Sequence, residues 1–134
     1  MFYKPEDGYC GDLMPYYIDG EFVFFYLRTN RPKEEFSDVS WHMVKTRDFV
    51  NYYDDKNLGI RGGTGSVIRK NDEYYIFYCD NSDFDHSEDK RQYICQGVTK
   101  DFKIIKEINK FSCKEIYYEK AHFRDPHVFY NEEK

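Results

Sequence analysis

Alanine and leucine are nearly absent from this sequence of 134 residues, which holds one alanine and three leucines. They are among the apolar residues with the strongest preference for helices. Tyrosine and phenylalanine, by contrast, occur 14 and 12 times, and aromatic side chains are enriched in strands. The composition therefore predicts an all-β protein and excludes a helical bundle.

Long apolar runs and an excess of basic residues are missing as well. No run approaches the roughly 20 apolar residues of a membrane-spanning helix, and the first twelve residues carry no signal-peptide pattern. The net charge of −5 argues against nucleic-acid binding, because such proteins neutralise phosphates with a basic face. We therefore expect a cytoplasmic protein that binds neither nucleic acid nor a membrane.

Closely spaced metal ligands are also lacking. The four cysteines, Cys10, Cys79, Cys95 and Cys113, include no Cys-x-x-Cys pair, and no histidine stands at zinc-finger spacing. We expect no bound metal and no cofactor, and we expect the cysteines to be buried free thiols in a reducing compartment. A disulfide that involves Cys10 or Cys79 is an alternative without positive support.

The apolar residues that are present form short runs bounded by turn residues, a pattern typical of strands. No segment has a convincing helical period. The sequence predicts six strands and the start of a seventh, at residues 22–27, 39–46, 66–69, 74–79, 93–99, 104–108 and 128–130.

Part of the chain repeats. Residues 19–26 (DGEFVFFY) resemble residues 71–78 (NDEYYIFY) at an offset of 52, and residues 46–49 (TRDF) resemble residues 99–102 (TKDF) at an offset of 53. A repeat of about 40–50 residues built from short strands is typical of β-propeller blades, each a four-stranded sheet. The sequence thus predicts a partial propeller of two blades and the opening strand of a third, at 125–130. The alternative is a β-sandwich with two similar hairpins.

Two aspartates stand where such blades would begin. Asp12 precedes the first predicted strand of the first blade, and Asp125 precedes the strand that would open the third. The innermost strands of a propeller begin near its axis, so these carboxylates would face one central pocket. A pair of carboxylates on either side of one sugar is what glycoside hydrolysis uses.

Five segments then match, in order and spacing, those of a known enzyme family. The family reads Trp-Met-Asn-Asp-Pro-Asn-Gly, Phe-Tyr-Gln, Trp-Gly-His-Ala with Ser-x-Asp-Leu, Phe-Ser-Gly-Ser, and Arg-Asp-Pro. This chain reads Cys10-Gly11-Asp12-Leu13, Phe25-Tyr26-Leu27, Trp41-His42-Met43-Val44 with Thr46-Arg47-Asp48-Phe49, Gly63-Thr64-Gly65-Ser66, and Phe123-Arg124-Asp125-Pro126. It resembles the five-bladed propeller glycosidases of glycoside hydrolase family 32: the invertases, levanases and sucrose-6-phosphate hydrolases.

The resemblance implies roles for six residues. Asp12 would be the nucleophile of a retaining reaction on fructosyl linkages, and Asp125 would bond sugar hydroxyls and stabilise the transition state. Arg124 would keep Asp125 ionised and orient the sugar ring. Thr64, Ser66 and Trp41 would bind the carbohydrate substrate.

Two departures from the family pattern keep other functions open. Leu13 follows the first aspartate in place of proline, and Leu27 stands in place of glutamine, so the specificity for sucrose is not implied. Glycoside hydrolase family 43 has the same propeller, and there Asp12 would be the general base of an inverting arabinosidase or xylosidase. A noncatalytic sugar-binding unit that self-associates is the third alternative.

The resemblance does not supply a general acid. In family 32 this glutamate lies in a Glu-Cys pair beyond the Arg-Asp-Pro triplet, whereas Glu132 and Glu133 are too close to the triplet. Without a proton donor a factor on the order of 10²–10⁴ in rate is lost. We therefore expect residues 1–134 to be the N-terminal fragment of a single propeller catalytic domain that is inactive alone. Further C-terminal blades or a homo-oligomer would complete the ring.

Overall fold

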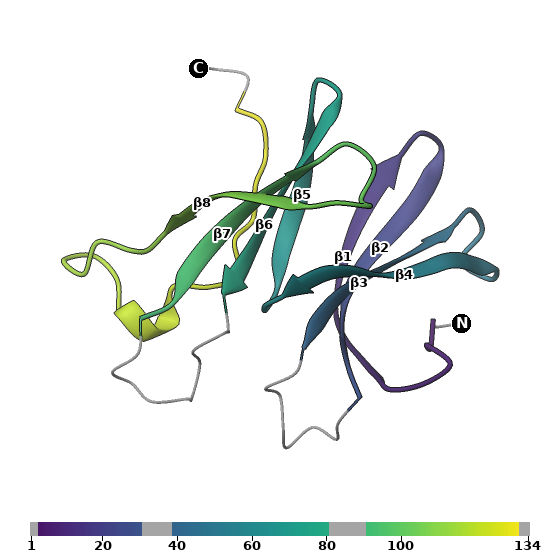
Figure 1. The fold of residues 1–134 in the computed structure, drawn as a ribbon, viewed down its shortest axis with the longest axis horizontal. Coiled ribbons are helices and arrows are strands. Elements are labelled where there is room, and N and C mark those ends of the chain that lie inside the picture. The colour runs from purple at the N-terminus through teal and green to yellow at the C-terminus, as the bar shows by residue number, and fades with distance from the viewer. Residues whose placement is uncertain (1–2, 31–38, 81–90, 132–134) are drawn as a thin grey trace.

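Two four-stranded antiparallel sheets make up the fold in a computed structural model, which describes residues 3–30, 39–80 and 91–131 (Figure 1). The first sheet contains β1 (Tyr9–Ile18), β2 (Glu21–Thr29), β3 (Ser40–Thr46) and β4 (Tyr52–Arg61). The second contains β5 (Gly65–Lys70), β6 (Glu73–Asp80), β7 (Tyr93–Thr99) and β8 (Lys106–Phe111). In each sheet the strands lie in chain order, as in a propeller blade. The all-β prediction is confirmed.

The helical content of the described ranges is one short 3₁₀ turn, η2 (Lys120–His122). None of the helices in these ranges is therefore long and apolar enough to cross a membrane.

The two predicted copies are structurally equivalent. The Thr46 hydroxyl accepts a hydrogen bond from the backbone N–H of Phe49 at 2.9 Å, and the Thr99 hydroxyl accepts one from Phe102 at 3.0 Å. Phe49 and Phe102 both have left-handed backbones, with φ of 58° and 59°. The same short motif thus makes the same turn after the third strand of each sheet, which confirms the internal repeat.

The first strands of the two sheets, β1 and β5, lie side by side and run in the same direction (Figure 1). The Gly65 N–H approaches Met14 Sδ at 3.2 Å, and the Arg69 N–H donates to the Tyr16 hydroxyl at 2.9 Å. These pairs are separated by 51 and 53 residues along the chain. A nearly constant separation means that both strands advance together, as the innermost strands of neighbouring blades do. This arrangement favours the propeller over the sandwich.

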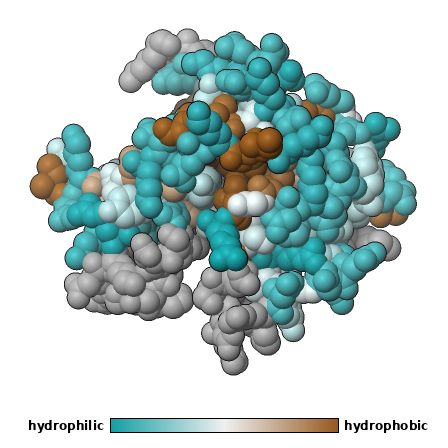
Figure 2. Space-filling model, in the orientation of Figure 1, coloured by the Kyte–Doolittle hydropathy of each residue, from teal (hydrophilic) through white to brown (hydrophobic). Residues whose placement is uncertain are grey.

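Apolar side chains from facing sides of the two sheets form one core. Phe102 lies between the sheets, 5.3 Å from the Phe25 ring and 4.5 Å from the Tyr74 ring. Figure 2 shows a largely hydrophilic face on which apolar side chains gather near the middle. The buried core members are Met14, Val23, Phe25, Trp41, Met43, Leu58, Ile60, Val67, Tyr74, Ile76, Tyr78, Cys95 and Phe102.

Two strands of the first sheet were not predicted. β1 and β4 were missed, because β1 contains Gly11, Asp12 and Pro15 and β4 is mostly polar and exposed. Pro15 is tolerated because β1 is the edge strand of its sheet.

The segment 125–130, expected to open a third blade, is not assigned as a strand. It runs alongside β5, but the hydrogen bonds to that strand are made by the Ser66 side chain. The Ser66 hydroxyl donates to the Pro126 carbonyl at 2.8 Å and accepts from the Val128 N–H at 3.1 Å. No strand in the described ranges forms a backbone ladder with it, and a strand is defined by such a ladder.

Phe102→Ala tests whether the two sheets share a core. We expect the free energy of unfolding to fall by about 3–5 kcal/mol, the usual cost of deleting a buried phenylalanine ring. Phe102 is 7% exposed, whereas its repeat partner Phe49 is 44% exposed, so Phe49→Ala should cost less than half as much. Both residues have the same left-handed backbone conformation. Any change in backbone strain caused by alanine is therefore the same in the two variants and does not affect their comparison. Urea denaturation followed by tryptophan fluorescence measures both, and equal losses would contradict the shared core.

Candidate active site

Asp12 projects from a β-bulge in β1. Gly11 pairs with Leu27 and Leu13 pairs with Tyr26, so Asp12 is an extra residue without a partner in the ladder. Its φ is 32°, and its side chain is exposed. Bulges beside functional sites re-aim a side chain. Asp12 therefore lies within β1, three residues after its start, in a strand that the sequence did not predict.

Thr64 holds one oxygen of this carboxylate. Its hydroxyl donates a hydrogen bond to Asp12 Oδ2 at 2.5 Å. Glycines on either side explain the position of Thr64: a Cβ on Gly62 would stand 2.4 Å from the Cys79 carbonyl oxygen, and one on Gly65 would stand 1.8 Å from that of Phe77. The glycine-rich segment thus lets the chain lie close to β6 as it enters β5. Thr64 binds one oxygen of Asp12, Oδ2, and leaves the other.

Asp125 follows η2 and has a left-handed backbone, with φ of 56°. Its backbone N–H donates to the sulfur of Cys79 at 3.0 Å. Arg124 Nε lies 3.8 Å from Asp125 Oδ2, and the two side chains are 48% and 58% exposed. Solvent screens such an ion pair, so the backbone contact is the firmer constraint on Asp125.

A short chain of contacts links the two aspartates. Thr64 bonds Asp12 through its hydroxyl, and the Thr64 carbonyl accepts the Cys79 N–H at 3.4 Å. Cys79 in turn accepts the N–H of Asp125. The structure therefore brings both aspartates to the same end of the β5–β6 hairpin, although they are far apart in the sequence.

The prediction that Trp41 binds the carbohydrate is wrong. Its side chain is fully buried, packs against Phe25 and Tyr78 with ring centroids 6.1 and 6.3 Å away, and cannot offer a platform to a sugar. Its indole N–H donates to the Gly63 carbonyl at 2.9 Å. Trp41 therefore supports the segment that carries Thr64 from within the core.

Ser66, a second predicted ligand of the substrate, is engaged within the protein. Its hydroxyl donates one hydrogen bond to the segment after Asp125 and accepts another from it. In this structure it anchors that segment against β5.

Comparison with known families identifies the fold and the class of chemistry. Residues 3–134 match the family model described as the Glycosyl hydrolases family 32 N-terminal domain. The chain belongs to glycoside hydrolase family 32. No curated protein sequence matches it. The resemblance inferred from the five motifs is thus confirmed, and the two sheets are blades of a family 32 propeller.

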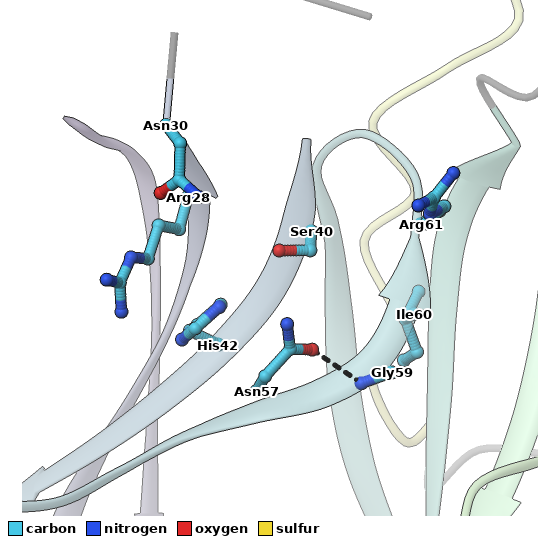
Figure 3. A pocket seen from close by; sticks show the side chains of 8 residues that line it. All are labelled: Arg28, Asn30, Ser40, His42, Asn57, Gly59, Ile60 and Arg61. Atoms are coloured by element: carbon cyan, nitrogen blue, oxygen red, sulfur yellow. Dashed lines mark hydrogen bonds between the residues drawn. The ribbon is translucent and has the colours of Figure 1, made fainter. Parts of the chain in front are cut away.

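A cavity of about 370 Å³ lies in the first sheet (Figure 3). It is formed where β2, β3 and β4 end or begin, and none of the six predicted site residues lines it. The Asn57 side-chain carbonyl accepts the Gly59 N–H at 2.7 Å on its floor. His42, also in the lining, is 7% exposed, and burial lowers the pKa of its imidazole. The family resemblance gives this cavity no role.

Sequence reasoning missed the part that Cys79 plays. A cysteine in an apolar strand is usually a small core residue, and no local pattern indicates that its sulfur contacts Asp125. No group of three or more histidine, cysteine, aspartate and glutamate side chains in the described ranges is arranged to hold a metal ion.

The cysteines are free, as predicted, but Cys10 is exposed while the other three are buried. Burial raises the pKa of Cys79 to about 11 and that of Cys95 to about 12. Because the thiolate is the reactive form, both residues remain protonated near neutral pH.

Alkylation with iodoacetamide at pH 8, read by peptide mass spectrometry, tests this difference. We expect Cys10 to react at least about tenfold faster than Cys79 or Cys95 in the folded protein, since it is accessible and they are buried and protonated. In denaturant all four should react at similar rates. A folded protein in which Cys79 reacts as fast as Cys10 would contradict the buried position of its thiol.

Proposed function

We propose that this chain carries the nucleophile and the transition-state stabiliser of a retaining glycosidase that acts on fructosyl linkages. Membership of family 32 supports glycosidase chemistry in general. The observation that carries the assignment is the linkage of Asp12 and Asp125 through Thr64 and Cys79.

In the proposed reaction, the free oxygen of Asp12 attacks the anomeric carbon of the fructosyl unit. The bond to the leaving oxygen breaks, that oxygen takes a proton from a general acid, and a covalent glycosyl ester forms on Asp12. Water then attacks the anomeric carbon, gives its proton back to the acid, and releases Asp12. The hydrogen bond from Thr64 fixes the carboxylate so that one oxygen remains directed to the substrate.

Asp125 accepts hydrogen bonds from sugar hydroxyls in this proposal, and its negative charge stabilises the oxocarbenium-like transition state. Arg124, next to it in sequence, orients the sugar ring through hydrogen bonds from its guanidinium. Because Leu27 stands where the family has glutamine, the substrate need not be sucrose. A fructan or another fructosyl oligosaccharide fits the proposal equally.

The general acid is assigned to none of the glutamates in the described ranges, and Glu132 and Glu133 lie outside these ranges. We place the proton donor on the blades that complete the ring. Experiments on activity should therefore use the full-length gene product.

Replacing each carboxylate by its amide tests the assignment. We expect Asp12→Asn and Asp125→Asn each to lower kcat/KM on fructosyl substrates by at least about 10²-fold, because each removes a group that acts on the reacting sugar. Asp19→Asn is the matched control. Asp19 is exposed and has a positive φ, 50°, as Asp12 and Asp125 do, so its replacement should leave kcat/KM unchanged. Unaltered turnover in both site variants would refute the assignment.

The configuration of the first product separates the two reaction types. Retention, followed by NMR of the released sugar, fits Asp12 as nucleophile, whereas inversion indicates a general base that activates water. We expect retention. Sugar binding without any turnover would instead indicate a noncatalytic binding unit.

A further inference from the structure

Cys79 occupies the junction between the segments that carry the two aspartates. Its N–H donates to the Thr64 carbonyl at 3.4 Å, and its carbonyl accepts the Gly63 N–H at 2.9 Å. Its sulfur accepts the Asp125 N–H at 3.0 Å. Cys79 is 2% exposed. It contacts the residues just before β5 through its backbone and the Arg-Asp-Pro triplet through its side chain.

The contact with Asp125 has a specific geometric effect. Left-handed backbone conformations are uncommon outside glycine, although aspartate tolerates them better than most residues, and they persist only where surroundings hold them. In Asp125 the N–H is held by the sulfur of Cys79, while Pro126 and Val128 are held by Ser66. The direction of the Asp125 carboxylate therefore depends on acceptors from two neighbouring strands, β5 and β6.

The same cysteine also reaches Asp12, through Thr64. The Thr64 carbonyl is bonded to Cys79 and the Thr64 hydroxyl is bonded to Asp12. A shift of the end of β6 would consequently move both carboxylates, and not only the nearer one.

We propose that Cys79 is a positioning residue that sets the backbone of Asp125 relative to Asp12. This inference rests on the proposed function, in which both carboxylates act on one sugar. Cys79 itself touches no substrate, and its part is to accept one hydrogen bond from the catalytic segment.

Threonine and valine at position 79 separate this role from packing. The two side chains have nearly the same shape, but only Cys79→Thr restores an acceptor for the Asp125 N–H. In the full-length protein we expect Cys79→Val to lower kcat about tenfold relative to Cys79→Thr, the order of effect of one neutral hydrogen bond. KM should differ by less than about threefold, because the transition state depends more on the placement of Asp125 than substrate binding does.

Hydrogen exchange provides a readout that needs no activity. We expect the Asp125 amide to exchange at least about tenfold faster in Cys79→Val than in Cys79→Thr, as measured by mass spectrometry of the peptide that contains it. Equal exchange and equal kcat in the two variants would overturn the proposal.

If the wild-type protein hydrolyses no fructoside, the proposed function fails, while the exchange comparison still decides whether Cys79 holds Asp125. If the branched side chains prevent folding, Cys79→Ser and Cys79→Ala form the corresponding pair and are judged by the same two measurements.

Discussion

The parallel approach of β1 to β5 is the contact on which the rest of the structure depends. Both strands begin their sheets, and side-chain and backbone groups link residues 51–53 positions apart along them. Glycine at positions 62 and 65 lets the segment that leads into β5 lie close to β6, because the backbone of β6 occupies the space that a side chain would need. The same approach brings the facing sides of the two sheets together. The core and the candidate site therefore both depend on the packing of β1 against β5.

The last described segment extends this pattern by one step. Its contacts with β5 join residues 60–62 positions apart, so a third piece of chain follows the direction of β1 and β5. Two of these three parallel pieces carry an aspartate with positive φ near their beginning, Asp12 and Asp125. Such backbone outliers in non-glycine residues cluster at functional sites. The parallel packing places both outliers at one end of the same hairpin.

Much of the fold was readable from the sequence because it depends on local patterns. Short apolar runs predicted six strands, and the motif around Phe49 and Phe102 revealed the repeat, since similar residues make the same turn. β1 and β4 were missed because neither shows a buried alternation of its own. β1 is stabilised by pairing with β2 and by the approach of β5, which no local window contains.

The sequence by itself determined the all-β class, the blade-like repeat and the two aspartates that mark the family, because composition, turn residues and short motifs are properties of neighbouring residues. Only the tertiary structure decided how these aspartates are held. It placed Asp12 in a bulge against Thr64, buried Trp41 beneath that segment, and brought Cys79 to the backbone of Asp125. These contacts join residues from different strands, and their geometry follows from how the sheets pack and not from the order of residues along the chain.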